Sequence, residues 1–277
     1  MIELWHCPDA RSFRPLWALE ELGLPYELHL LPFPPRVREP AFLEINPLGT
    51  IPAMKDGETF MTESAAIVQY LVTRHGPSDM AVPIDDPAYG AWLNWLHFGE
   101  ATLTFPQTLV LRYRQFEPGK AEVVADDYAQ WFLSRLRHLT RALADGREWL
   151  CAGRFTMADV CVGYALLFAR TLNLDHRFSP EIAAYWDRLS ARPAFRAAQA
   201  AQVLRRLNGL QQRSHVSCSG SPPCGPRRAR PRCVASHSGQ GLAALGPAIL
   251  ERIDETGQAP SAIQRSVCRW QIGRAHV

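Results

Sequence analysis

Strand-like and helical patterns of apolar residues alternate over the first 75 positions of the chain. Residues 2–5 and 26–31 alternate apolar and polar side chains, which predicts two strands. Between them, the apolar residues from Phe13 to Leu22 have helical spacing, and Gly23 marks the end of that helix. A strand–helix–strand unit of this length predicts two parallel strands joined by a right-handed crossover.

The following segment predicts a hairpin enclosed by two helices. A proline-rich connection leads to a short helical stretch at residues 39–45. Residues 51–54 and 59–61 are strand-like and flank an Asp-Gly pair, which is typical of a hairpin turn. Residues 64–76 have helical spacing and end in a glycine. The predicted order is therefore β-α-β-α-β-β-α.

The apolar pattern changes to helical throughout after the first domain. A linker at residues 77–86 separates an α/β domain at 1–76 from an all-helical domain at 87–202. Thr156 and Asp159 are predicted to form a capping box at the start of a helix. In this motif the Thr hydroxyl accepts a hydrogen bond from a main-chain N–H near Asp159, and the Asp carboxylate accepts one from the Thr156 N–H. The fold class is therefore α/β followed by an all-α helical bundle.

The amino-acid composition is typical of a globular protein with a hydrophobic core. Of 277 residues, 47% are hydrophobic and 21% are charged, with 30 basic against 27 acidic side chains. Apolar runs are all shorter than the roughly 20 residues that a membrane helix needs, and no basic-then-apolar leader opens the chain. We expect a cytoplasmic protein with no membrane partner.

The charge is concentrated at one end of the chain. Residues 203–277 hold 11 arginines, no lysine and three acids, and residues 214–241 are rich in Gly, Pro, Ser and Arg without any period. A nucleic-acid-binding arm is one interpretation. Residues 272–277 resemble the translation of a sequencing adapter, so we expect a disordered or non-native extension from a frameshift. We assign it no function and expect no nucleic-acid partner.

Several kinds of site are not indicated by the sequence. Its seven cysteines have irregular spacings, which predict neither a disulfide framework nor a paired zinc site. Glycine-rich phosphate loops and the His-Glu-x-x-His motif do not occur either. We therefore expect no metal and no bound nucleotide.

Residues 1–202 resemble the soluble glutathione transferase family. The resemblance rests on five motifs in the family's order: Asn46-Pro47-Leu48-Gly49, Ile51-Pro52, Glu63-Ser64, Thr156-x-x-Asp159 and Ala191-Arg192-Pro193-Ala194-Phe195. The run from Trp17 to Tyr26 is similar to bacterial members. The resemblance implies a thioredoxin-like first domain, glutathione as co-substrate and a small electrophile as the second substrate.

The resemblance also implies a glutathione cradle. Ile51, held by a cis bond to Pro52, would offer its main chain to the tripeptide; the alternative is a trans proline that starts an edge strand. Glu63 and Ser64, at a helix start, would bind the γ-glutamyl group; the alternative is a plain helix cap. Thr50 stands where many members carry a cation for the glycyl carboxylate, and so departs from the pattern.

The residue that activates the thiol is ambiguous. Ala10 stands where related members carry a serine, and alanine has no donor. Ser12 is the one hydroxyl between the first strand and the first helix, so its side chain and N–H could hold the thiolate. Cys7, in a Cys-Pro-x-Ala segment like that of omega-type members, could have a low pKa beside the helix N-terminus. An ordinary buried thiol is the alternative for Cys7.

Three functions remain open on the sequence alone. They are conjugation of glutathione to electrophiles, a thiol–disulfide oxidoreductase acting through Cys7, and a non-catalytic glutathione-binding module. His97 and Glu100 share a helix face that could contact the electrophile, although a solvated polar face is equally consistent. The family resemblance further implies a homodimer, with residues 59–70 of one subunit against residues 92–114 of the other.

Overall fold

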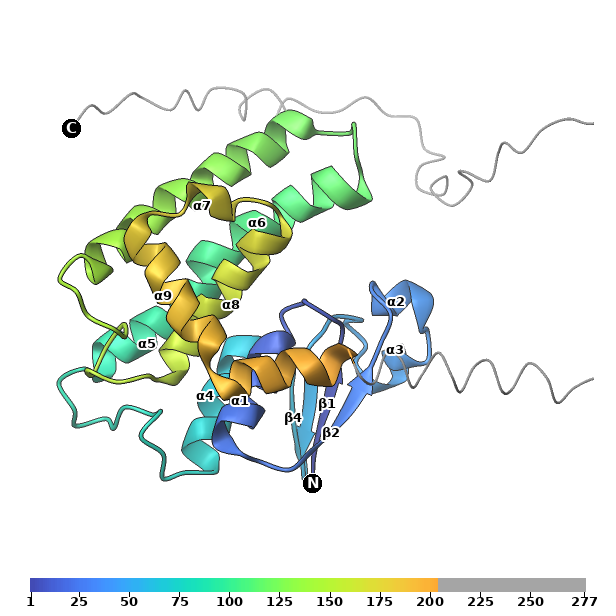
Figure 1. The fold of residues 1–277 in the computed structure, drawn as a ribbon. Coiled ribbons are helices and arrows are strands. Elements are labelled where there is room, and N and C mark those ends of the chain that lie inside the picture. Colours follow the sequence, from blue (N-terminus) through green and yellow to red (C-terminus); the bar gives the residue numbers. More distant parts are fainter. Residues whose placement is uncertain (204–277) are drawn as a thin grey trace, which may run out of the picture. The chain divides into compact units, whose positions relative to one another are not determined.

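The computed structural model describes residues 1–203, which begin with an α/β domain (Figure 1). The predicted disorder or frameshift after residue 203 lies outside the described residues. Elements of the α/β domain follow the predicted order, with the short helix split in two: β1 (Ile2–His6), α1 (Phe13–Leu22), β2 (Tyr26–Leu30), α2 (Pro35–Arg38), α3 (Phe42–Ile45), β3 (Ala53–Asp56), β4 (Thr59–Met61) and α4 (Ser64–Arg74).

The four strands form one mixed sheet in the order β2-β1-β3-β4. β1 pairs in parallel with β2, as the crossover predicts, and antiparallel with β3, which forms the predicted hairpin with β4. The Ile51–Pro52 bond is cis, as predicted. β3 begins at Ala53 rather than at Ile51, because a proline has no N–H to donate to the ladder. The thioredoxin-like α/β fold is confirmed.

Helices make up the rest of the described chain. They are α5 (Tyr89–His97), the π-helix η1 (Phe98–Thr104), α6 (Phe105–Leu111), the π-helix η2 (Arg112–Phe116), α7 (Glu122–Leu143), α8 (Met157–Thr171), the 3₁₀-helix η3 (Asp175–Arg177), α9 (Pro180–Ala191) and a helix over residues 193–203. Figure 1 shows this last helix, in orange, reaching back beside the α/β domain. The all-α second domain is therefore confirmed.

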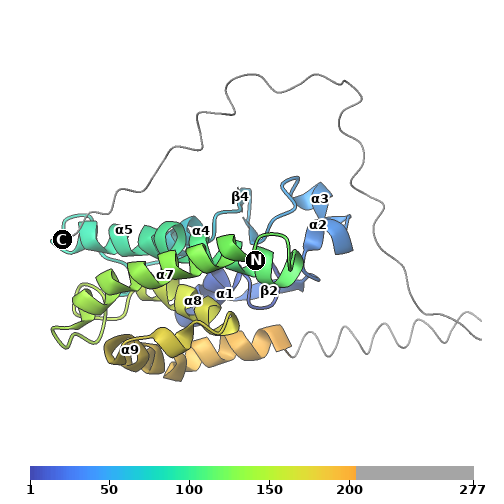
Figure 2. The same ribbon diagram turned by 90° about the horizontal axis from the view of Figure 1, so that it is seen from above.

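The capping box predicted at the start of α8 is present. The Thr156 hydroxyl accepts from the Ala158 N–H at 3.3 Å, and the Asp159 carboxylate accepts from the Thr156 N–H at 2.8 Å. α8 runs through the centre of the molecule, next to α1 (Figure 2). At their contact, a Cβ on Gly163 would lie 2.8 Å from the Trp17 ring, so only glycine allows this approach.

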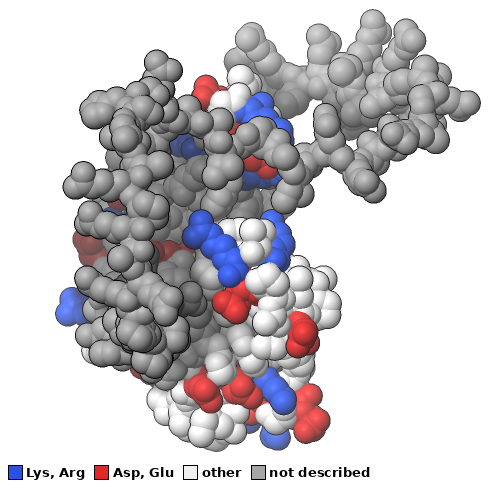
Figure 3. All heavy atoms as spheres, turned by 90° about the vertical axis from the view of Figure 1, so that its right-hand side faces the viewer, with Lys and Arg blue, Asp and Glu red and all other residues white. Residues whose placement is uncertain are grey.

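The described surface carries both signs of charge. Figure 3 shows acidic and basic side chains interspersed over the face that it presents. Within residues 1–203, no helix is both long enough and apolar enough to cross a membrane.

Candidate functional site

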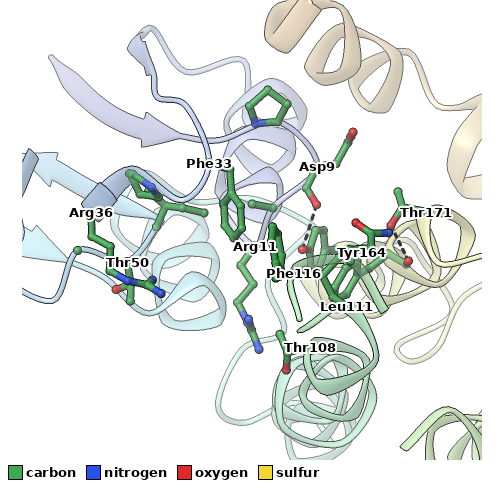
Figure 4. Close-up of a pocket in the computed structure, with 17 residues that line it drawn as sticks. Asp9, Arg11, Phe33, Arg36, Thr50, Thr108, Leu111, Phe116, Tyr164 and Thr171 are labelled. Carbon is green, nitrogen blue, oxygen red and sulfur yellow. Dashed lines mark hydrogen bonds between the residues drawn. The ribbon is translucent and has the colours of Figure 1, made fainter. Parts of the chain in front are cut away.

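A cavity of about 460 Å³ lies between the α/β domain and the helices (Figure 4). Six segments of the chain line it. The α/β domain contributes the loop after β1, the region around α2 and the segment before β3; α6, η2 and α8 contribute the opposite wall. The lining residues are Pro8, Asp9, Ala10, Arg11, Phe33, Pro35, Arg36, Gly49, Thr50, Ile51, Thr108, Leu111, Gln115, Phe116, Tyr164, Phe168 and Thr171.

The segment before β3 brings two predicted residues to the cavity. Thr50 and Ile51 line it, while Pro52 is buried beside them. Arg36 of α2 lines the same part and packs on Gly49, where a Cβ would lie only 2.6 Å from the Arg36 Cβ. A cation therefore stands beside Thr50, although it comes from a different element. Sequence reasoning missed Arg36, and the basic residues of the short helix were the available signal.

The other predicted part of the cradle lies at the start of α4. Ser64 is buried, and its hydroxyl oxygen accepts a hydrogen bond from Arg14 Nη1 at 3.0 Å. Among residues 1–203, the Ser64 hydroxyl donates no hydrogen bond of its own. Glu63 precedes it at the N-cap and is exposed. Neither residue lines the cavity, so their contact with glutathione stays a prediction.

Cys7 and Ser12 are held to each other beneath the cavity. The Cys7 N–H donates to Ser12 Oγ at 3.2 Å, and Ser12 Oγ donates to the Cys7 carbonyl at 3.4 Å. Both side chains are fully buried, and neither lines the cavity. Burial raises the pKa of the Cys7 thiol to about 12. The expectation of a low-pKa thiol at Cys7 is therefore wrong, because the loop turns Ala10 and Arg11, rather than Cys7, toward the cavity.

Arg11 is the cation that this loop presents beside the predicted sulfur site. Its side chain is 31% exposed, and its Nε donates to Glu100 Oε1 at 2.6 Å. Among residues 1–203, its two terminal nitrogens have no hydrogen-bond partner. Figure 4 shows the Arg11 side chain extending from the loop along the cavity. The guanidinium can therefore receive an anion while Glu100 holds it in place.

His97 and Glu100 are not among the residues that line the cavity, so their contact with an electrophile stays a prediction. Glu100 turns instead toward two guanidiniums, those of Arg11 and Arg14. Burial alone would raise the pKa of Glu100, but these two cations lower it below its ordinary value. His97 is exposed on α5. Helix spacing alone did not show that Glu100 binds two arginines while His97 is exposed to solvent.

Aromatic and aliphatic side chains form the opposite wall. Phe33, before α2, and Phe116, at the end of η2, approach each other with ring centroids 5.5 Å apart. Leu111 and Phe168 extend this apolar surface, and the Tyr164 hydroxyl donates to the main-chain carbonyl of Asp9 at 3.3 Å. An apolar ligand group fits this wall, opposite the cationic one. Sequence reasoning missed it, because the residues come from four separate elements.

One group of three possible metal ligands occurs within residues 1–203, away from the cavity. Glu3 and Glu27 lie on neighbouring strands beside His29, and all three are partly exposed or exposed. His29 Nε2 lies 3.1 Å from Glu3 Oε2, so the histidine already has a partner. Among the described residues that line the cavity, Asp9 alone bears a carboxyl group, and that carboxylate accepts a hydrogen bond from Gln202 Nε2.

Two family models match separate parts of the chain. The model for "Glutathione S-transferase, N-terminal domain" matches residues 10–74, and that for "Glutathione S-transferase, C-terminal domain" matches residues 127–198. The chain is 30% identical over 214 residues to glutathione S-transferase 3 of Schizosaccharomyces pombe, covering 72% of this chain and 86% of that protein. It is 27% identical over 207 residues to GstA of Escherichia coli O157:H7, and the match covers 74% of this chain and 100% of that protein.

Solved structures agree with these matches. A crystal structure of a glutathione transferase from Methylococcus capsulatus superposes with a TM-score of 0.67 at 28% identity, covering 74% of this chain and all of that one. Ure2p in complex with glutathione shares the fold, with a TM-score of 0.63 at 23% identity, covering 71% of this chain and 97% of that one. These relatives come from fungi and bacteria, so they do not assign the chain to a bacterial branch.

Proposed function

This chain belongs to the glutathione S-transferase family, and from that premise we propose that it binds glutathione and joins its thiolate to small electrophilic molecules. The observation that carries the proposal is the composition of the cavity. One wall offers a main chain beside a cis proline and two arginines, and the other is mainly aromatic and aliphatic, with Thr108, Gln115 and Thr171 among them. An anionic, extended tripeptide suits the first wall, and an apolar electrophile suits the second.

The cationic wall supports a specific orientation of glutathione. Ile51 would bind the peptide through its main-chain groups, and Arg36 would bind the glycyl carboxylate in the place of the cation that position 50 lacks. Ser64 and Glu63 would bind the γ-glutamyl carboxylate and ammonium groups at the start of α4. A charge-assisted hydrogen bond of this kind contributes about 1.5–3 kcal/mol.

The sulfur site in this proposal has no side-chain hydroxyl. The Ser12 hydroxyl is bound to the Cys7 main chain, so Ser12 would contribute its N–H at the start of α1. Arg11 would supply a positive charge beside it. Both groups favour the thiolate over the thiol, because a nearby cation and the positive end of a helix lower the pKa of a thiol. The catalytic contribution is thiolate stabilisation together with proximity of the two substrates.

Calorimetric titration of two ligands tests the binding part. Arg36→Ala should weaken glutathione binding about tenfold to a hundredfold and leave the affinity for γ-glutamylcysteine, which has no glycyl group, unchanged. Arg38→Ala is the matched control, since Arg38 is exposed on the same helix and does not line the cavity. Equal losses for both ligands would contradict the role of Arg36. Wild-type protein that binds neither ligand would defeat the proposed function.

Two assays separate conjugation from the alternatives. Activity with a chromogenic aryl halide indicates a transferase, and Arg11→Gln should then lower kcat about 10²–10³-fold. Activity only with a mixed disulfide of glutathione would indicate an oxidoreductase. Glutathione binding without either activity would indicate a binding module. That last candidate is favoured by one observation: the loop residues that line the cavity, Pro8 to Arg11, carry neither a hydroxyl nor a thiol.

We also propose that the protein is a cytoplasmic homodimer. Residues 59–70 of one subunit would pack against residues 92–114 of the other. Phe60 in β4 is 44% exposed and Phe105 in α6 is 54% exposed, which supplies apolar surface for a two-fold contact. Light scattering on the full chain checks the assembly, and a monomeric mass at micromolar concentration would contradict it.

A further inference from the structure

Gln202 connects the last described helix to the loop that faces the cavity. Its amide oxygen accepts from the Asp9 N–H at 3.2 Å, and its amide nitrogen donates to Asp9 Oδ1 at 2.8 Å. The same amide oxygen lies 3.0 Å from His6 Nε2. Gln202 is only 5% exposed. A single buried amide therefore contacts both the end of β1 and the loop, although 193 residues separate it from Asp9.

The geometry of this contact fixes the orientation of the Gln202 amide. The Asp9 N–H can only donate and the Asp9 carboxylate can only accept, so the amide oxygen must face the first and the amide nitrogen the second. His6 Nε2 must then carry a hydrogen, because the amide oxygen only accepts. Burial lowers the pKa of His6 to about 4, which keeps the ring neutral near pH 7. Each of the three hydrogen bonds in the contact thus joins a donor to an acceptor.

Asp9 has a backbone conformation that needs support. Its φ is +57°, in the left-handed region that few residues other than glycine, asparagine and aspartate adopt. Its N–H and carboxylate bind Gln202, and its carbonyl accepts from Tyr164, as the dashed line in Figure 4 marks. Every polar group of Asp9 is therefore held by the helical domain. The turn that follows presents Ala10 and Arg11 to the cavity.

From these contacts we infer that Gln202 is a positioning residue for the thiolate site, acting through Asp9. It holds the loop in its left-handed turn, so that Arg11 and the first N–H groups of α1 face the sulfur of glutathione. It also keeps the Asp9 carboxylate bound, away from a thiolate that the carboxylate would repel. The inference rests on the proposed function, since the thiolate in question is that of glutathione.

The charged and titratable groups around the loop come from five parts of the chain. Besides Cys7, Asp9 and Arg11 on the loop, they are His6 from β1, Arg14 from α1, Glu100 from η1 and Tyr164 from α8. Without Gln202, the Asp9 carboxylate loses its amide partner and the Asp9 N–H loses its acceptor. A freed carboxylate and a relaxed turn both raise the thiol pKa. The loss of activity should therefore be largest at low pH and shrink as the pH rises.

Four proteins test this inference: wild type, Gln202→Ala, Gln107→Ala and the double variant Asp9→Asn/Gln202→Ala. Gln107 is the matched control, because it is also a buried glutamine that bridges helices, donating to the Leu103 and Ala165 carbonyls at 2.9 and 3.0 Å. It contacts neither the loop nor the cavity. Asparagine at position 9 keeps an acceptor, tolerates the left-handed turn and removes the charge.

The main readout is the pKa of the bound glutathione thiol, from the ultraviolet absorbance of the thiolate against pH and from the pH profile of kcat/KM. Gln202→Ala should raise this pKa by about half a unit to one unit, and the double variant should recover at least half of that shift. Gln107→Ala should lower the melting temperature without moving the pKa. An unchanged pKa in Gln202→Ala, or an equal shift in Gln107→Ala, overturns the inference.

A second readout needs no glutathione. Hydrogen exchange of peptides that cover residues 8–12 should be faster in Gln202→Ala than in wild type, and unchanged in Gln107→Ala. If wild-type protein binds no glutathione, the proposed function fails, and this measurement still decides whether Gln202 holds the loop. Equal exchange in wild type and Gln202→Ala would show that Gln202 does not hold the loop.

Discussion

The guanidinium carbon of Arg14 lies 4.3 Å from the centre of the Tyr164 ring, and both side chains are buried. From α1, Arg14 also donates to Thr104 Oγ1 at 2.6 Å and to the Gly99 carbonyl at 3.2 Å, at the two ends of the π-helix η1. Its remaining charge is balanced by Glu100. One cation from the α/β domain thus binds polar groups near both ends of the π-helix.

Replacing Arg14 should therefore destabilise the whole described fold. Arg14→Met keeps an apolar side chain of similar length but leaves Glu100 with Arg11 alone, and should cost about 3–5 kcal/mol of unfolding free energy. Urea denaturation measures this loss. Arg114→Met is the control, since its ion pair with Asp126 is exposed and should contribute less than about 1 kcal/mol. Equal losses in the two variants would contradict the role given to Arg14.

Gly99 should tolerate no side chain, in contrast to Gly90 on the same helical segment. A Cβ on Gly99 would lie 2.6 Å from the carbonyl carbon and oxygen of Cys161 in α8, and main-chain atoms cannot move aside cheaply. Gly99→Ala should cost at least about 1–3 kcal/mol. A Cβ on Gly90 meets nothing within 4 Å, so Gly90→Ala should gain about 0.5–1 kcal/mol. Thermal melting of both variants checks the pair.

The Cys7 thiol should react slowly in the folded protein. Because burial raises its pKa to about 12, the thiolate is scarce at pH 7.5. Alkylation by iodoacetamide should be about a thousandfold slower than for a free cysteine. Peptide mapping by mass spectrometry follows Cys7 separately from the other cysteines, and labelling in urea is the control. Rapid labelling of native Cys7 would restore the oxidoreductase interpretation.

Folding stability should fall when the pH is lowered through the titration of His6. Burial lowers the pKa of His6 to about 4 in the folded state, whereas an unfolded histidine titrates near about 6.5. The unfolded state therefore binds more protons between these values, so the unfolding free energy decreases as pH falls from 6.5 to 4. Protonation of His6 alone should lower the unfolding free energy by about 2 kcal/mol between pH 7 and about 4.5.

Urea denaturation at both pH values isolates that contribution when wild type is compared with His6→Leu. The variant lacks the titrating ring, so its loss of stability on acidification should be smaller by that amount. His97→Leu is the control, because His97 is exposed. Identical pH dependence in wild type and His6→Leu would show that His6 is not held neutral.

Much of the fold was predictable because its signals are local. Apolar spacing gave the helices, alternation gave the strands, and an Asp-Gly pair gave the hairpin turn, where Gly57 has a φ of +58°. The capping box from Thr156 to Asp159 involves groups three residues apart. The ends of strands were predicted less well: β3 begins at Ala53 and not at Ile51, because where a strand begins depends on hydrogen bonds to the neighbouring strand. Spacing also did not predict the two π-helices: η1 contacts α8 and binds Arg14 of α1, and η2 packs against α6 and α7.

By itself, the sequence determined the order of elements, the family and the Thr50–Ile51 wall of the cavity, since each depends on neighbours in the chain. Only the tertiary structure decided that Arg11 and Arg36 face the cavity while Cys7 and Ser12 are buried. It also brought Gln202 to Asp9 across 193 residues. The reason is that side-chain exposure and the pKa of a thiol depend on contacts between residues that are distant in the sequence. Those contacts form only when the helical domain packs against the α/β domain.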